Sequence, residues 1–232
     1  MKALKKAKYR AGVNTDLKIL LACALKKEQA QYDTPKAINK DYHTVLRHLK
    51  ALQHDGLICF TQTQEAKKHG KEKKFYTVTL RGLANLLAVE EKAWNNINEI
   101  AKNHTDKLLV FRKWDFFAKE NLQRLIVGNL KHALVSLQEQ TLMFATLGFP
   151  IVWKEEVLRL AVDGQSLGCY YLAGSKQLQD SEVFKPYLAI LKACKKDSEL
   201  TKFVEDQLKL YEQNAKEQLG SLEEAKKIWF SL

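Results

Sequence analysis

Apolar residues recur at helical spacing in a short stretch near the start of the chain. They stand three or four residues apart, at Val45, Leu49 and Leu52. This spacing predicts the buried face of an amphipathic helix. Asp41 suits the N-cap, because its carboxylate can accept from the free N–H groups of the first turn. Gly56 suits the position just past the helix end, where glycine tolerates a positive φ. We therefore predict a helix over residues 42–54.

The opposite face of this predicted helix is basic. Positions i, i+4, i+7 and i+11 line one side of a helix, and here they hold His43, Arg47, Lys50 and His54. A solvated helix face usually mixes acids with bases, but no acid follows the Asp41 cap until Asp55. A short helix with a basic, donor-rich stripe is what the major groove of DNA accepts.

The flanking segments predict further elements. Asp33 or Thr34 caps a second short helix, with Pro35 at its first position and a turn at 39–40. Two runs rich in β-formers, residues 57–63 and 75–79, enclose a basic tip, which predicts a hairpin. Thr79 then caps the next helix.

These residues resemble archaeal winged-helix transcription regulators, which are related in fold to the ArsR-like and MarR-like families. The resemblance rests on the runs 39–45, 47–50 and 55–58, and on residues 76–83, where the second wing strand enters the next helix. It covers roughly residues 15–87. The chain departs from the family pattern at Thr34-Pro35, where an Ile-Ala pair is usual, and this departure predicts a short second helix.

The resemblance implies binding of double-stranded DNA, with the helix 42–54 in the major groove and the hairpin as a wing. The expected base-contacting residues are Tyr42, His43, Thr44 and Arg47. Arg47 is the best base reader, because its guanidinium can bridge guanine O6 and N7. Tyr42 either stacks on a backbone sugar or packs against the second helix. The expected backbone-contacting residues are Lys36, Lys40, Lys50, Lys67, Lys68, Lys71, Lys73 and Lys74.

The N-terminal segment is basic and lacks acids. Residues 1–14 form either an arm that tracks phosphates or a solvated tail. Thr15 or Asp16 opens the first helix of the domain, which ends near Lys27. Residues 28–31 then read as a polar connection.

After the hairpin, the pattern predicts one long helix from Leu80 to about Asn103. Its apolar positions alternate by four and three, at Leu83, Leu87, Trp94, Ile97 and Ala101, with Glu90 interrupting them. A buried helix within one subunit has the same pattern. We favour a homodimer seam over residues 83–101, supported by the later helices, because DNA regulators commonly bind as two-fold pairs.

Everything from Lys107 onward reads helical. The fold class predicted is therefore mainly α, with an N-terminal winged helix-turn-helix domain and an all-α C-terminal domain. The expected divisions are a basic arm over 1–14, a DNA-binding domain over 15–82, and a helical dimerisation or sensing domain over 83–232.

Charge divides the chain in the same place. The formal net charge is +11 over 232 residues. Residues 1–84 hold 18 Lys and Arg against 7 Asp and Glu, whereas residues 85–232 hold 20 of each kind. The whole imbalance lies in the N-terminal part of the chain, which contains the basic residues 1–14 and the segment that resembles a DNA-binding domain. This distribution indicates a polyanion-binding module joined to a neutral one.

Little in the sequence suggests other chemistry. The four cysteines, Cys23, Cys59, Cys169 and Cys194, form no Cys-x-x-Cys pair, so we expect reduced, metal-free thiols. No phosphate loop, nucleophile elbow or metalloprotease motif occurs, and we expect neither an enzyme nor a cofactor. No apolar run has the length of a membrane span or signal peptide, which predicts a cytoplasmic protein. The sequence names no small-molecule effector.

Two classes of function remain. The first is a sequence-specific transcription regulator that reads the major groove. The second is an architectural or chromatin-associated protein, or an RNA binder, that uses the same basic surface without choosing a sequence. A winged helix can also serve as a protein-interaction module, but the bases on the helix and the hairpin argue against that use.

Overall fold

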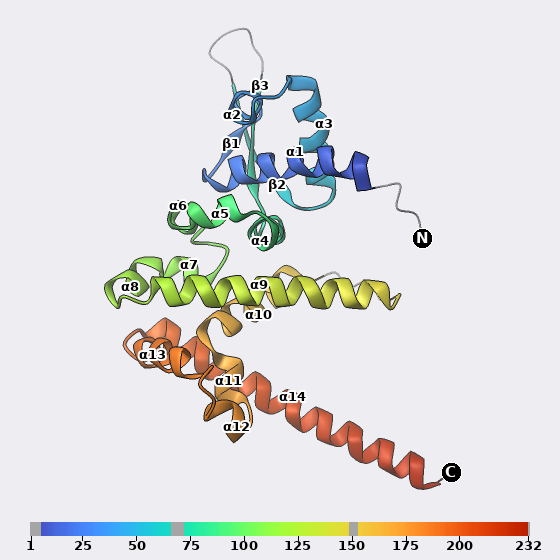
Figure 1. The fold of residues 1–232 in the computed structure, drawn as a ribbon, viewed down its shortest axis with the longest axis vertical. Coiled ribbons are helices and arrows are strands. Elements are labelled where there is room, and N and C mark those ends of the chain that lie inside the picture. Colours follow the sequence, from blue (N-terminus) through green and yellow to red (C-terminus); the bar gives the residue numbers. More distant parts are fainter. Residues whose placement is uncertain (1–5, 66–71, 149–152, 232) are drawn as a thin grey trace. The chain divides into compact units, whose positions relative to one another are not determined.

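The computed structural model describes residues 6–65, 72–148 and 153–231. The protein is mainly helical, as expected, with a small antiparallel sheet of three strands (Figure 1). The elements up to the sheet are α1 (Lys6–Ala24), β1 (Gln29–Ala30), α2 (Thr34–Ile38), α3 (Tyr42–His54), β2 (Ile58–Glu65) and β3 (Glu72–Val78). The later helices are α4 (Leu80–Val89), α5 (Glu91–Asn95), α6 (Ile97–Asn103), α7 (Leu109–Arg112), α8 (Trp114–Lys119), α9 (Gln123–Thr146), α10 (Glu155–Leu167), α11 (Cys169–Ala173), α12 (Lys176–Gln179), α13 (Lys185–Cys194) and α14 (Ser198–Ser231).

The chain divides into two compact units. Unit 1 contains residues 1–116 and 131–162, and unit 2 contains residues 117–130 and 163–232. The division expected after residue 82 therefore does not coincide with the compact units. Residues 83–116 belong to the same unit as the sheet, because α4 to α7 continue the packing that α1, α3 and β3 begin.

The first helix begins earlier than the sequence indicated. α1 starts at Lys6, so the expected start at Thr15 or Asp16 is wrong, and most of the expected arm over 1–14 is helical. Lysine, alanine and arginine are strong helix formers, so residues 6–14 suit an extension of the helix toward the N-terminus. Asp16 has a tertiary role instead, because its Oδ1 accepts a hydrogen bond from Nδ1 of His48 at 2.7 Å.

The core of unit 1 joins α1, α3 and α4. The predicted stripe on α3 is buried, with Val45, Leu49 and Leu52 each no more than 3% exposed. Its neighbours in the core include Ile19, Leu20, Val78, Leu80, Leu83 and Leu86. Burial of side chains of this size contributes about 1.5–3 kcal/mol each to folding. The amphipathic helix predicted over 42–54 is therefore confirmed, including both of its ends.

The sheet contains a strand that the sequence pattern did not indicate. β3 lies in the middle, with β2 on one side and the two-residue strand β1 on the other. Gln29 pairs with Tyr76 and Ala30 with Phe75 in β1–β3. Residues 28–31 are thus not merely a connection. A two-residue strand has no detectable periodicity, so its existence depends on the neighbour with which it pairs.

Three backbone segments meet closely where α3 ends and α4 begins. The Thr79 hydroxyl donates to the Gly56 carbonyl at 2.8 Å and accepts from the N–H of Gly82 at 3.0 Å. Gly82 lies directly against Leu57, since a Cβ at this position would stand 1.9 Å from the Leu57 carbonyl oxygen. The start of α4 is therefore held against the segment that follows α3.

The long helix expected over residues 80–103 is broken into α4, α5 and α6. The breaks fall at Glu90 and Asn96, neither of which has helical dihedral angles. The Glu90 carboxylate accepts from the N–H of Lys92 at 3.1 Å and so caps α5. The Trp94 indole N–H donates to the Leu87 carbonyl at 2.7 Å, the acceptor that residue 91 would use in a continuous helix.

The expected homodimer seam over 83–101 is consequently wrong in its location. Its apolar positions are already covered within the chain, since Leu83, Leu87, Trp94, Ile97 and Ala101 are each no more than 9% exposed. Acidic substitutions of Trp94 or Ile97 would disrupt this core rather than separate two subunits. A homodimer stays a prediction, and it requires another surface.

His104 is a buried residue that closes the end of α1. Its side chain is 1% exposed, and its Nε2 donates to the Ala24 carbonyl at 2.9 Å. The neighbouring Asn103 amide donates to the Leu25 carbonyl at 2.8 Å. Burial lowers the pKa of His104 below its ordinary value of 6.5. This histidine is therefore a satisfied core residue.

We expect His104 to make the stability of unit 1 depend on pH. Because its folded-state pKa is lower than its unfolded value, the unfolded chain binds the proton more readily, and stability decreases as the pH falls below about 6.5. Urea titrations between neutral and mildly acidic pH should show a shallower pH dependence in His104→Gln than in the wild type. His132→Gln, at an exposed position, should leave the dependence unchanged. Equal pH dependence in His104→Gln and the wild type would contradict this role.

Unit 2 is built around aromatic side chains. Tyr171 packs against Tyr187 with ring centroids 4.6 Å apart and against Phe184 at 6.1 Å. α10 continues through Gly164 to Leu167, and α11 follows it. The buried face of this segment allows the helix to pass through Gly164, because packing offsets the cost of about 1 kcal/mol for one glycine in a helix.

The cysteines are free thiols in the structure. Cys23, Cys169 and Cys194 are buried, and burial raises the pKa of each to about 12. They pack as small apolar side chains. No group of three potential metal ligands occurs among the described residues. None of the described helices is both long and apolar enough to cross a membrane.

Candidate nucleic-acid interface

The start of α3 is fixed by its cap. The Asp41 carboxylate accepts from the N–H of Thr44 at 2.8 Å, as expected for an N-cap. This hydrogen bond lowers the pKa of Asp41, so the cap is ionised at neutral pH. At the other end, Gly56 follows the helix with φ +69°, the conformation that the sequence predicted for it. Both ends of α3 are therefore set by local residues.

The basic face of α3 is exposed. His43, Arg47, Lys50 and His54 all lie at the surface, opposite the buried stripe that faces the core. Nδ1 of His54 lies 3.2 Å from a carboxylate oxygen of Asp55, so the far end of the face is partly neutralised whenever His54 is protonated. Along α3 itself, no acidic residue stands between the Asp41 cap and Asp55. We call His43, Arg47, Lys50 and His54 the α3 face.

Tyr42 is held by contacts within the protein. Its ring stacks on Tyr32 with centroids 5.4 Å apart and planes 7° from parallel. The Gln31 side-chain amide donates to the Tyr42 hydroxyl, and the Tyr42 and His43 rings form an edge-to-face pair with centroids 5.8 Å apart. These partners, Gln31 and Tyr32, lie in the segment before α2. They tie the first turn of α3 to that segment, and the stacking of Tyr42 on a backbone sugar stays a prediction.

Thr44 differs from the other expected base-contacting residues. Its side chain is half-buried and its N–H is bound by the cap, whereas His43 and Arg47 are exposed. His48, on the flank of α3, is engaged with Asp16 of α1. The side chains of α3 that remain open to a ligand are therefore mainly those of the α3 face.

The expected backbone-contacting lysines lie at several places around α3. Lys36 on α2, Lys40 in the turn before α3, and Lys74 on β3 are exposed. Lys73 is engaged, since its ammonium lies 3.3 Å from the Asp33 carboxylate and 5.5 Å from the centre of the Phe75 ring. Lys67, Lys68 and Lys71 lie outside the described residues.

Several residues that shape this surface were not indicated by the sequence. Tyr32 and Gln31 hold Tyr42, and Asp33 holds Lys73. Each of these contacts joins residues at least ten positions apart, on different elements. Helical or strand spacing indicates only which residues of one element share a face. No pattern in the sequence could therefore have revealed these contacts.

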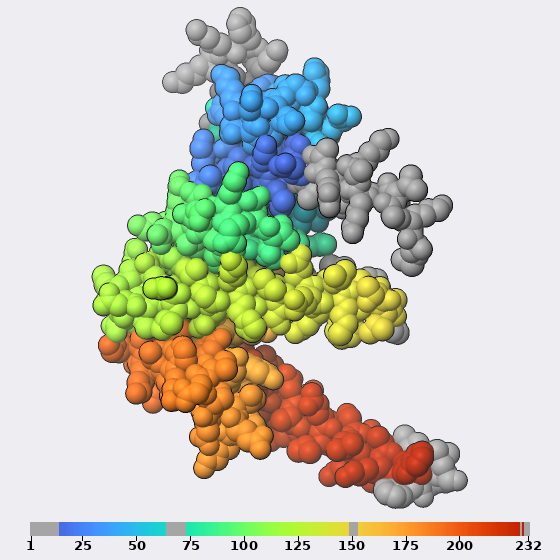
Figure 2. Space-filling model, in the orientation of Figure 1, coloured from blue at the N-terminus to red at the C-terminus, as the bar shows by residue number. Residues whose placement is uncertain are grey.

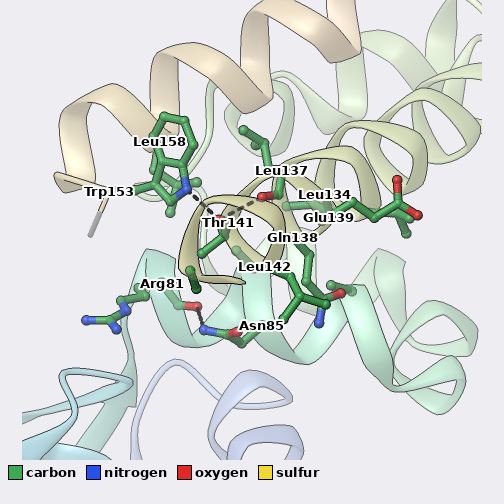
Figure 3. Close-up of a pocket in the computed structure, with 14 residues that line it drawn as sticks. Arg81, Asn85, Leu134, Leu137, Gln138, Glu139, Thr141, Leu142, Trp153 and Leu158 are labelled. Carbon is green, nitrogen blue, oxygen red and sulfur yellow. Dashed lines mark hydrogen bonds between the residues drawn. The ribbon is translucent and has the colours of Figure 1, made fainter. Parts of the chain in front are cut away.

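Unit 1 also contains a cavity of about 550 Å³ beside α4. Its walls are largely apolar and come from α4, from the C-terminal half of α9, and from Trp153 and Leu158 (Figure 3). The Trp153 indole donates to the Thr141 hydroxyl at 2.8 Å, which in turn donates to the Leu137 carbonyl at 2.7 Å. The volume lies in the range of small-molecule sites. A molecule bound here would touch the helix whose start is held against Leu57.

Comparisons with known proteins identify no relative. No protein-family model matches the chain, and neither a curated protein nor a solved structure matches it.

Proposed function

We propose that this protein is a sequence-specific DNA-binding transcription regulator whose residues 15–82 form a winged helix-turn-helix domain. The observation that carries the proposal is the α3 face, an exposed stripe of cations and histidines on a capped helix whose other side is core. The order α1, β1, α2, α3 and then a hairpin with a basic tip supports the same class of domain.

In this proposal, α3 enters the major groove and Arg47 and His43 face the base edges. Arg47 is exposed in the second turn of the helix, and a guanidinium suits guanine because it donates to O6 and N7 together. In the same proposal, the exposed Lys36, Lys40, Lys50 and Lys74 meet phosphates, which fix orientation without reading sequence. Lys73 can join them by exchanging the Asp33 carboxylate for a phosphate.

A comparison of binding to selected and random duplexes tests this function. Sequences bound by the protein are first selected from genomic DNA, and affinities are then measured at physiological salt. A regulator should prefer its selected site to random DNA by about 10³-fold or more. Equal affinity for all duplexes would favour the alternative, a non-sequence-specific architectural protein that binds through the same surface.

We expect the phosphate contacts to be separable from base reading by their salt dependence. Lys40→Ala combined with Lys74→Ala should weaken selected and random duplexes alike. The slope of log affinity against log salt should become flatter by up to about 2, because each lysine that neutralises a phosphate releases about one counterion. Lys176→Ala, an exposed lysine of α12 in the neutral part of the chain, is the matched control and should leave the slope unchanged. An unchanged slope in the double variant would exclude these two contacts.

A further inference from the structure

The last helix changes character partway along its length. α14 has 34 residues, and its first part packs on α11 and α13 within unit 2. Leu200 and Gln207 are buried there, and Tyr211 is half-buried. Every side chain from 212 to 227 is exposed, and this part of α14 (red) extends beyond the other helices of unit 2 (Figures 1 and 2).

The exposed part still carries an apolar stripe. The residues recur every three or four positions, at Ala215, Leu219, Leu222, Ala225 and Trp229, in phase with the packed positions Val204, Leu208 and Tyr211. The exposed fractions are 62% for Leu219, 51% for Leu222 and 71% for Trp229. We call residues 215–229 of this stripe the α14 face. An isolated helix of this length is marginal in water, and an exposed apolar stripe favours a partner helix.

The charges beside the α14 face identify the partner. Leu219 lies at one edge of the α14 face, and Glu212 and Lys226 stand along the same edge, seven residues before and seven residues after it. The opposite edge carries the uncharged Asn214 and Ser221. Two antiparallel helices bring equivalent edges together. An antiparallel second copy would therefore place Glu212 of each helix beside Lys226 of the other, with the two Leu219 side chains at the centre.

We propose that this protein self-associates as a two-fold dimer through antiparallel pairing of the α14 face. Ala215 of one copy then lies beside Ala225 of the other, and Trp229 covers the half-buried Tyr211. A parallel pair would instead bring the charged edge against the uncharged one and form no such ion pairs. Glu212 also contacts Lys216 of its own helix at 2.6 Å, and an exposed carboxylate can hold both lysines. The proposal does not depend on DNA binding.

Sedimentation of the full chain tests the self-association. The wild type should be dimeric at micromolar concentration. Leu222→Glu should weaken the dimer by about 10-fold or more, because a two-fold interface buries the new charge twice. Gly220→Glu is the matched control, since it adds the same charge on the outer side of the helix, where no atom lies within 4 Å of a new Cβ. A monomeric wild type, or equal effects of both variants, would overturn the proposal.

Charge reversal tests the antiparallel arrangement. Glu212→Lys and Lys226→Glu should each weaken the dimer by up to about 10-fold, because each exposed pair contributes little but occurs twice. The double variant should recover the wild-type affinity. The contact between Glu212 and Lys216 of the same helix is lost in Glu212→Lys and stays lost in the double variant. A change in that contact therefore cannot explain a rescue. Failure of the rescue, or additive weakening, would contradict pairing of Glu212 with Lys226.

Cysteine substitution tests the same arrangement in a second way. Leu219→Cys should form an intermolecular disulfide under mild oxidation, because position 219 meets itself in the antiparallel pair. Leu222→Cys should not, because position 222 lies beside 218 of the other copy. The unsubstituted chain controls for the half-buried Cys59. A disulfide at 222 and none at 219 would indicate a parallel pair and overturn the proposal.

Discussion

Replacing Gly82 with alanine is expected to destabilise unit 1 by about 3 kcal/mol, near the upper end of the usual cost of overpacking. The new Cβ would stand 1.9 Å from the Leu57 carbonyl oxygen and 2.8 Å from its carbon. These are backbone atoms, so no side-chain rotation can relieve the contact. Either α4 or the segment after α3 has to move, and the Thr79 hydrogen bonds to Gly56 and Gly82 would be strained with it.

Chemical denaturation followed by circular dichroism measures this effect. Gly220→Ala is the matched control, because Gly220 also lies in a helix but has no atom within 4 Å of a new Cβ. The control should be neutral or should stabilise the helix by up to about 1 kcal/mol. A midpoint for Gly82→Ala equal to that of the wild type would show that α4 does not pack on Leu57 as described. Because α3 ends beside Leu57, the proposed DNA binding through α3 should also decrease in Gly82→Ala.

Replacing Arg47 with alanine is expected to cost about 1–3 kcal/mol of binding on the preferred duplex and much less on random DNA. Arg47 is exposed and lies opposite the buried stripe, so its removal should leave the fold intact. A guanidinium that donates to O6 and N7 of one guanine distinguishes that base from the other three. The loss should therefore appear as reduced preference rather than as uniformly weaker binding.

Lys50→Ala is the appropriate control for Arg47→Ala. This variant also removes a cation from the α3 face, three residues further along α3. Unlike Arg47, however, Lys50 is expected to meet a phosphate and not a base. Its effect should be similar on preferred and random duplexes and should decrease with added salt. If Arg47→Ala behaves like Lys50→Ala, Arg47 does not read bases, and the architectural alternative becomes the better account of this surface.

The helix at the centre of the proposed interface was predictable because its determinants are local. Asp41 caps Thr44, the stripe from Val45 to Leu52 faces the core, and Gly56 takes a positive φ just after the helix. All three lie within sixteen residues and obey helical spacing, so the sequence alone defines them. The exposure of the α3 face follows directly, since burial of one side leaves the other at the surface.

The features that were wrongly predicted depend on contacts that helical or strand spacing does not encode. The four-three spacing over 83–101 suits one continuous helix as well as it suits three shorter ones. In the structure the Trp94 indole donates to the Leu87 carbonyl, and Glu90 caps α5, so the helix is broken. Strand β1 exists through its pairing with β3, as Gln29 meets Tyr76. Periodicity reveals neither event, because the break depends on individual side-chain hydrogen bonds and the strand depends on the neighbour with which it pairs.

The candidate site was only partly predictable for the same reason. The exposed positions His43 and Arg47 follow from helical phase. The engagement of Tyr42 by Tyr32 does not, and neither does the ion pair between Lys73 and Asp33. These contacts engage Tyr42 and Lys73 within the protein, and helical phase alone does not show which exposed side chains are so engaged.

One measurement tests the central claim, that α3 reads DNA sequence, most directly. It is a double-mutant cycle that combines Arg47→Ala with 7-deazaguanine, which lacks N7, at each guanine of the preferred duplex in turn. If Arg47 bridges O6 and N7, its removal and the loss of N7 should be strongly non-additive at one guanine, with a coupling energy of about 1 kcal/mol or more. All other guanines should give additive losses. Additive losses at every guanine would show that Arg47 contacts no guanine N7, and they would contradict the claim.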